Sequence, residues 1–314
     1  MCAPWRLLTP GLALLALAVP ASGQQVADTA YRFANESPAY PPNAGPRVCV
    51  DGGHQNYHTV EGRYRPFALL LEQDGYVVVP LEAAFDSVAL AGCRIVVIAN
   101  ARAPVDAQGQ AYPHAAAFAR DEVNALFAWV RQGGSLLLVA DHPPFAGAAA
   151  GLAALLGFQL FDGYAGPSAA WPTGTMIFGA LDEEAIRSAT ERHSIPHEQF
   201  RSTIGEPGRL ADHAILRGRT ARESVTTVVT FTGHAFFPSQ DVEPLLVLGP
   251  DASGLVVLGP NAPGARPEEY PRFSLAGWLQ GGVRRIASGR VALLGEAAMC
   301  SAQWRADSSA FRWG

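Results

Sequence analysis

Four short apolar runs, each stopping abruptly at polar residues, constrain this chain more than any other feature. The runs are VCV (48–50), IVVIA (95–99), SLLLVA (135–140) and VALLG (291–295). Each has the length and composition of a buried strand, and segments with helical spacing occupy several of the intervals between them. This alternation predicts an α/β fold with three layers, in which helices cover both faces of a doubly wound, mostly parallel sheet.

The remaining elements are predicted from periodicity and from turn residues. A further strand is expected at 76–80, a short one at 158–161, and helices at 64–73, 85–90, 120–132 and 146–156. From Val225 the pattern changes to β-like runs at 225–231, 244–249 and 254–259, followed by a closing pair at 273–282 and 290–294. We therefore expect an added antiparallel β portion in the C-terminal part.

The N-terminal segment has the layout of a secretory signal peptide. Arg6 precedes the apolar stretch 12–19, and the small residues 21–23 offer a cleavage point, so we assign 1–23 to a signal peptide. Residues 24–45 are expected to form an extended lead-in, and 46–314 a single α/β domain with a lid or loop excursion at 162–211. These features predict an exported protein, periplasmic or extracellular.

Charge and composition exclude several functions. Removing 1–23 takes away one arginine and no acid, so 22 arginines face 28 acidic residues and the net charge is −6. Such a chain has no field that would gather nucleic acid, and once the leader is removed we expect no membrane insertion. The chain also has no lysine, which excludes Schiff-base chemistry, a Walker phosphate loop and Ser-Lys pairs.

Three cysteines remain beyond the leader, at Cys49, Cys93 and Cys300. Their spacing forms no metal motif, and an odd count cannot make a complete disulfide framework. We expect Cys49 and Cys93 to be small core residues. A bridge between these two is the alternative, open to a protein in an oxidising compartment.

Polar residues follow each of the four strand-like runs. Because the carboxyl ends of parallel strands border the crevice in which α/β sheets bind ligands, we expect these residues to form one pocket. The residues assigned to binding a small-molecule or carbohydrate ligand are Asp51, Gly53, Asn56, Asn100, Arg102 and, after a later β run, His234. The residues assigned to catalysis are His54, His58, Asp141, His142 and Glu296.

Two kinds of chemistry fit this set. In one, some of His54, His58, Asp141 and His142 hold a divalent metal such as Zn²⁺, which activates a water. In the other, His54 or His142 is a general base oriented by Asp141 or Glu296. Amide groups from Asn56, Asn100 and the backbone around Gly53 would then stabilise developing negative charge. No G-x-S-x-G elbow is present, which argues against a serine hydrolase of the usual α/β type.

The same residues have structural interpretations. Asp51 and Asp141 stand where a carboxylate caps a turn or helix, and Glu296 could pair with Arg63 or Arg102. The glycines after Asp51 would permit a positive φ.

Several blocks resemble a known superfamily. Gly277-Trp278, Gly281, the run Gly289 to Ala292 and Gly295 resemble the closing hairpin of trehalose-utilisation-type proteins. These belong to the class I glutamine-amidotransferase-like superfamily, whose fold is flavodoxin-like. The passage FAWVRQGGSLLLVADH is similar to that superfamily's central unit. The blocks DGGHQNYH, ADHPPFAGAA and GEAAMCSAQ resemble an exported branch of it, over about residues 46–304.

The resemblance implies a fold more than a reaction. Glutaminase members need a nucleophilic cysteine on the turn after a central strand, where this chain has Asp141-His142-Pro143. A glutaminase is therefore not expected. The residues favour a hydrolase of a small or carbohydrate-like substrate, and the alternative is a non-catalytic ligand-binding module on the same fold.

Overall fold

The structure is a computed structural model that describes residues 27–28, 32, 34–104, 115–168, 175–180, 187, 204–256 and 271–302. The signal peptide expected at 1–23 and much of the excursion expected at 162–211 lie outside the described residues.

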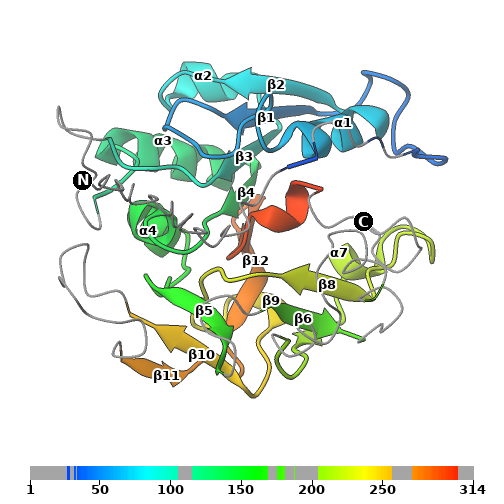
Figure 1. Cartoon of the computed structure of the whole chain (residues 1–314). Helices are drawn as coiled ribbons and strands as arrows, with labels where there is room; N and C mark the ends of the chain where they lie inside the picture. The colour runs from blue at the N-terminus through cyan, green and yellow to red at the C-terminus, as the bar shows by residue number, and fades with distance from the viewer. Residues whose placement is uncertain are drawn as a thin grey trace, which may run out of the picture.

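An eight-stranded mixed sheet forms the centre of the described molecule (Figure 1). Its strand order is β2-β1-β3-β4-β13-β12-β9-β7. The first five strands run parallel to one another. Each of β12, β9 and β7 then pairs antiparallel with the strand that precedes it in this order. The bounds of these strands, in chain order, are β1 Arg47–Asp51, β2 Val77–Leu81, β3 Ile95–Ala99, β4 Ser135–Val139, β7 Arg209–Leu210, β9 Glu243–Val247, β12 Leu279–Ile286 and β13 Gly289–Leu294.

Two small antiparallel sheets lie next to the antiparallel end of the large one (Figure 1). The first has the order β11-β10-β5 and the second pairs β6 with β8. Their bounds are β5 Tyr164–Pro167, β6 Met176–Gly179, β8 Thr227–Thr230, β10 Ala252–Leu255 and β11 Arg272–Ser274. The predicted antiparallel portion is thus present. The large sheet is mixed, with four parallel and three antiparallel strand pairings.

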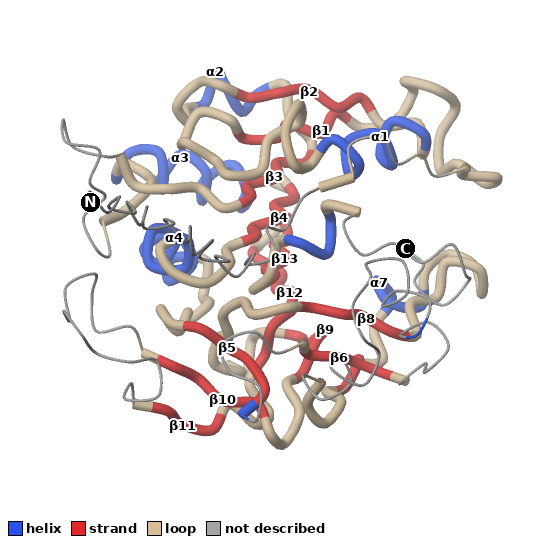
Figure 2. Tube along the Cα trace, viewed as in Figure 1, coloured by secondary structure: helices blue, strands red, loops and turns tan. Residues whose placement is uncertain are grey.

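Helices cover both faces of the parallel strands. Figure 2 shows α1 on one side of the stacked strands, with α3 and α4 on the other. The helix bounds are α1 Arg65–Gln73, α2 Ser87–Ala91, α3 Arg120–Arg131, α4 Phe145–Leu155 and α7 Ala214–Arg217, with a 3₁₀ turn at Ala298–Cys300. In the described part of the chain, none of them combines the length and apolar character needed to cross a bilayer.

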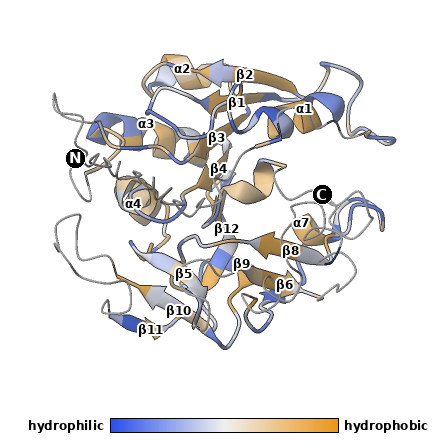
Figure 3. Cartoon of the chain, viewed as in Figure 1, coloured by the Kyte–Doolittle hydropathy of each residue, from blue (hydrophilic) through white to orange (hydrophobic). Residues whose placement is uncertain are grey.

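The core follows from alternation along the strands. In β3, Val96 and Ile98 pack into the cluster that faces α2, α3 and α4, whereas Val97 and Ala99 pack into the cluster beneath α1. Successive strand side chains point to opposite faces, so a fully apolar strand supplies both layers. Figure 3 shows apolar colouring along the central strands and both colours on α3.

One predicted strand is wrong. The apolar run 158–161 forms only an isolated bridge, between Leu160 and Phe236, and the strand begins later, at Tyr164. Phe158 is 1% exposed because it packs edge-on against Phe236. A short apolar run does not distinguish a strand from a buried irregular segment, and here tertiary packing decides.

For Cys49 and Cys93, the structure shows the alternative, a bridge, rather than two separate core residues. Cys49 in β1 and Cys93, just before β3, form a disulfide whose Cα atoms are 5.7 Å apart. The parallel pairing of β1 with β3 brings these two positions together. The predicted burial of Cys49 is confirmed, at 3% exposure.

We predict that the disulfide contributes about 4 kcal/mol to the free energy of unfolding, because it closes a loop with a sequence separation of 44. Denaturant unfolding with and without reductant measures this contribution. The double variant Cys49→Ala, Cys93→Ala should be about as stable as the reduced wild type and should not respond to reductant. Equal stability of oxidised and reduced wild type would contradict the prediction.

Candidate functional site

The carboxyl ends of β1, β3, β4 and β13 meet at one edge of the sheet, and Asn100 joins three of them. Its Oδ1 accepts a hydrogen bond from the Asp141 backbone N–H at 2.9 Å, and its carbonyl accepts one from Tyr57 N–H, also at 2.9 Å. Asn100 has φ of 52°, a conformation that Asn tolerates better than most residues. The strand ends expected to border one pocket thus lie at one edge of the sheet.

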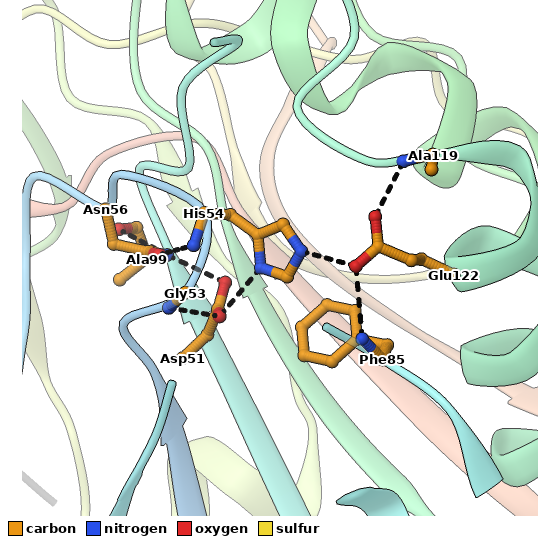
Figure 4. A network of polar contacts seen from close by, with 8 residues as sticks. All are labelled: Asp51, Gly53, His54, Asn56, Phe85, Ala99, Ala119 and Glu122. Carbon is orange, nitrogen blue, oxygen red and sulfur yellow. Dashed lines mark hydrogen bonds and ion pairs between the residues drawn. The ribbon is translucent and has the colours of Figure 1, made fainter. Parts of the chain in front are cut away.

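The first polar group at this edge, which we call the His54 clamp, consists of Asp51, His54 and Glu122 (Figure 4). His54 Nδ1 lies 2.8 Å from Asp51 Oδ1, and its Nε2 lies 2.9 Å from Glu122 Oε1. The ring centroids of Phe85 and Phe118 lie 4.5 and 4.8 Å from the centroid of the imidazole. Both ring nitrogens of His54 are therefore occupied by protein carboxylates.

The two carboxylates decide the charge of this imidazole. Burial alone would lower the pKa of His54, but the hydrogen bonds and charges of Asp51 and Glu122 outweigh burial and raise it above 6.5. For Glu122, burial acts in the opposite direction and would raise the pKa. The hydrogen bonds from His54 and from the N–H groups of Ala119 and Phe85 outweigh burial and lower the pKa.

The clamp is continuous with the 52–58 loop. Asp51 accepts from Gly53 N–H at 3.2 Å and from Asn56 Nδ2 at 2.9 Å, and Asn56 Oδ1 accepts from His54 N–H at 3.1 Å. Arg102 donates its backbone N–H to the His54 carbonyl at 3.0 Å and its Nε to the Gln55 carbonyl at 2.9 Å. Gly53, Asn56 and Arg102, expected to bind a ligand, thus make contacts that hold this loop.

The glycines of the loop are needed for space. A Cβ on Gly53 would lie 2.7 Å from the carbonyl oxygen of Glu82, and one on Gly52 would lie 2.4 Å from that residue's carboxylate. The positive φ expected at these glycines falls instead on Gln55, at 50°.

The second polar group, which we call the carboxyl pair, consists of Asp141 after β4 and Glu296 after β13. They are 4% and 0% exposed. Asp141 accepts from the backbone N–H of His142 at 2.7 Å and of Ala297 at 3.5 Å. Glu296 accepts from Ala298 N–H at 2.6 Å and from Met299 N–H at 3.3 Å. Both side chains therefore cap the turns that follow their strands.

Burial sets the protonation of this pair. It raises the pKa of Glu296, and the negative charge of Asp141 raises it further. Burial also raises the pKa of Asp141, an effect that His142 and the surrounding N–H groups oppose. Burial therefore favours the protonated form of both groups, and Glu296 is the one whose pKa is raised well above its ordinary value.

Six aromatic side chains extend in a row along this edge, and we call them the aromatic arc. Neighbouring ring centroids along it are separated by 4.7, 5.4, 5.8, 6.1 and 4.8 Å, in the order Tyr64, His58, Tyr57, Phe145, His142 and Tyr164. Tyr64 donates its hydroxyl to the Ala297 carbonyl at 3.1 Å, which places one end of the arc beside the carboxyl pair. Tyr57 is 45% exposed and forms the solvent side.

The other predicted histidines differ in exposure. His58 and His234 are 4% and 0% exposed, and burial lowers their pKa values to about 3 and about 4. Within the described chain, His58 Nδ1 has no hydrogen-bond partner. His142 is half-buried, and its Nδ1 donates to the Pro143 carbonyl at 2.9 Å. The fold thus separates His54 from His142, and His142 alone of the four is partly open to solvent.

The proposed metal ligands do not converge. Across the described residues, no three His, Cys, Asp or Glu side chains are grouped so that they could hold a metal ion. The ring nitrogens of His54 already face carboxylates. The donor set expected from His54, His58, Asp141 and His142 therefore does not fit a metal centre.

Glu122 and most of the aromatic arc were not identified from sequence. Glu122 lies in the first turn of α3, and its Oε2 accepts the Ala119 backbone N–H at 2.8 Å, a common helix-start contact. The amphipathic pattern predicts this helix, but nothing in the spacing links Glu122 to His54, 68 residues away.

A separate cavity of about 330 Å³ lies away from the strand ends. Its lining residues are Pro42, Asn43, Leu69, Glu72, Gln73, Val77 and Val78. None of them belongs to the polar groups described above, so we keep the carboxyl edge as the candidate site.

Comparison with known proteins gives structural neighbours only. No family model and no curated protein matches the sequence. The N-terminal domain of mmIFT52 is 11% identical, over 82% of this chain and 89% of that chain, with a TM-score of 0.49. A ThuA-like protein from Bacteroides uniformis is 14% identical, over 85% of each chain, with a TM-score of 0.41.

An exo-β-1,4-mannosidase from an Opitutaceae bacterium is 13% identical and has a TM-score of 0.38, over 82% of this chain and 32% of that chain. At these identities and TM-scores, no neighbour bears on the reaction.

We predict that replacing Glu296 by Gln becomes more favourable as pH rises. Because the raised pKa of Glu296 keeps it protonated in the folded state, the wild type loses stability as pH rises above about 4.5, where this group ionises in the unfolded chain. Gln cannot ionise, so the stability of the variant relative to wild type should increase between about pH 4.5 and 8.

Denaturant unfolding at a series of pH values measures this difference, with Glu61→Gln as a control at an exposed position. A difference that stays constant with pH, or moves in favour of wild type, would show that Glu296 is ionised in the folded protein.

Proposed function

We propose that this chain is a hydrolase of small, carbohydrate-like substrates that acts where the carboxyl pair meets the aromatic arc. The observation that carries the proposal is the carboxyl pair itself. Two buried carboxyl groups with raised pKa values lie at the ends of adjacent parallel strands, and the half-buried His142 directly follows Asp141. Pairs of titratable groups with different protonation states are typical of acid–base sites.

His142 is the residue best suited to act as general base. A carbonyl oxygen can only accept, so the contact with Pro143 makes Nδ1 the donor and leaves Nε2 with a lone pair. Nε2 would take a proton from a water molecule as that water attacks the substrate, and would later return it to the leaving group. The negative charge of Asp141 would stabilise the imidazolium formed in between.

The aromatic arc supports a small, uncharged ligand with apolar faces. His142 is stacked on Tyr164, with an interplanar angle of 19°, and Tyr57 presents a partly exposed ring. Aromatic walls with a few polar groups are typical of small-molecule sites. An anionic substrate would be repelled by Asp141 in these buried surroundings.

Three wider expectations belong to the same proposal. The parallel order β2-β1-β3-β4-β13, with helices on both faces, supports a doubly wound, flavodoxin-like arrangement and the predicted superfamily. The Cys49–Cys93 disulfide supports export to an oxidising compartment. The turn Asp141-His142-Pro143 supports the exclusion of glutaminase chemistry.

A non-catalytic ligand-binding module remains the second candidate. It is favoured by the His54 clamp, because an imidazole with both nitrogens engaged cannot act as a base. It is also favoured by the capping contacts of Asp141 and Glu296, which suit a rigid scaffold.

We predict that His142→Ala lowers hydrolysis by about 10²–10⁴-fold, the usual range for loss of a general base, with little change in melting temperature. The measurement is a panel of chromogenic glycosides and esters, run with the wild type, His142→Ala and His213→Ala. His213 caps α7 and contacts Glu243 at the surface, so it serves as the histidine control.

Equal activity of His142→Ala and wild type would contradict the assignment of the base. Absence of turnover, together with a rise in melting temperature when sugars are added, would replace the hydrolase with the binding module.

A further inference from the structure

His54 faces two carboxylates with its two ring nitrogens, and this geometry defines its protonation state. A carboxylate oxygen only accepts hydrogen bonds when ionised, whereas neutral imidazole carries one N–H and one lone pair. A neutral His54 would turn its lone pair toward Asp51 or Glu122 at less than 3 Å. Only the imidazolium can donate to both, so His54 is held protonated.

The remaining hydrogen-bonding capacity of the clamp is also satisfied. Glu122 Oε1 accepts from Phe85 N–H at 3.1 Å, and its Oε2 accepts from Ala119 N–H at 2.8 Å (Figure 4). Asp51 accepts from Gly53 and Asn56 in the same way. The side chains of His54, Asp51 and Glu122 are 6%, 0% and 14% exposed. Buried ions are tolerated only when they are paired and hydrogen-bonded in this manner.

The clamp connects α3 to the 52–58 loop, which supplies part of the proposed site. Tyr57 and His58 stand at the end of this loop and form the middle of the aromatic arc. Their position depends on the backbone at 54–56, which is tied by Asn56 and by Arg102. A residue that holds His54 therefore also holds Tyr57 and His58.

We infer that Glu122 is a positioning residue, which acts through a protonated His54 to hold Tyr57 and His58 at the substrate side of the site. The positioning of Tyr57 and His58 toward a substrate rests on the proposed function. The contacts of the His54 clamp and the protonation of His54 do not rest on it.

The charged groups around the clamp are few among the described residues. Apart from Asp51 and Glu122, the Glu82 carboxylate lies against Gly52, and the Arg102 guanidinium contacts the Gln55 carbonyl. The neighbouring rings of Phe85 and Phe118 are uncharged. Removing Glu122 therefore removes one of the two partners of His54.

The test is a nuclear magnetic resonance titration, with ¹⁵N detection of the histidine rings and ¹³C detection of the tyrosine rings, in the wild type, Glu122→Gln and Asp121→Asn. Asp121 is the matched control, because it lies in the same first turn of α3 but is exposed. Both variants remove one negative charge near the helix N-terminus, so they share the loss of its interaction with the helix dipole.

We expect the wild type to show both ring N–H signals of His54 above pH 6.5. Glu122→Gln should lower its titration midpoint by about one unit or more, the usual effect of losing an adjacent opposite charge. It should also shift the ring signals of Tyr57 and His58, whereas Asp121→Asn should leave all three unchanged. The His54 midpoint reports its pairing with Glu122, whereas the Tyr57 and His58 signals report whether that pairing positions them.

Two results would overturn the inference. A single ring N–H on His54 at pH 6.5 would show that the imidazole is neutral, and an altered midpoint with unmoved Tyr57 and His58 signals would show that the clamp does not position them. If Glu122→Gln does not fold, Glu122→Asp keeps the charge at a shorter reach and serves in its place. None of these readouts needs turnover, so failure of the hydrolase assay leaves this test intact.

Discussion

Burying two carboxyl groups at the ends of neighbouring parallel strands is the constraint on which the rest of this site depends. An isolated buried charge is costly, and two like charges side by side are costlier. The chain meets this constraint by turning backbone N–H groups toward both residues, while burial raises the pKa values of both and so favours their protonated forms. The result is two capped carboxyl groups and an adjacent histidine in one compact arrangement.

The fold provides this arrangement through strand order rather than through any single motif. Pairing β4 with both β3 and β13 puts Asn100, Asp141 and Glu296 in line at one edge. The 52–58 loop then crosses that edge and is tied to Asn100 through Tyr57. The His54 clamp and the carboxyl pair are thus two separate networks, joined by one asparagine. One holds the loop, and the other provides the reactive groups of the proposed chemistry.

Much of this edge is predictable from sequence, because parallel strands end together. Apolar runs that stop at polar residues correctly identify Asp141, Glu296 and Asn100 as neighbours. The function of His54 is not predictable in this way, because its second partner, Glu122, comes from a helix face that ordinary amphipathic spacing leaves exposed. The disulfide is not predictable from sequence for a related reason. Cys49 and Cys93 look like core residues, and only the register of β1 against β3 shows that their side chains meet.

The structural neighbours are too distant to supply a mechanism. The proposed hydrolysis depends instead on the protonation of the carboxyl pair. Infrared difference spectroscopy at neutral pH, comparing wild type with Glu296→Gln in ordinary and heavy water, measures it directly. We predict a carbonyl stretching band of a protonated carboxylic acid in the wild type, sensitive to deuterium and missing from the variant. A wild-type spectrum with only ionised carboxylates, or a protonated band that survives in Glu296→Gln, would contradict the account.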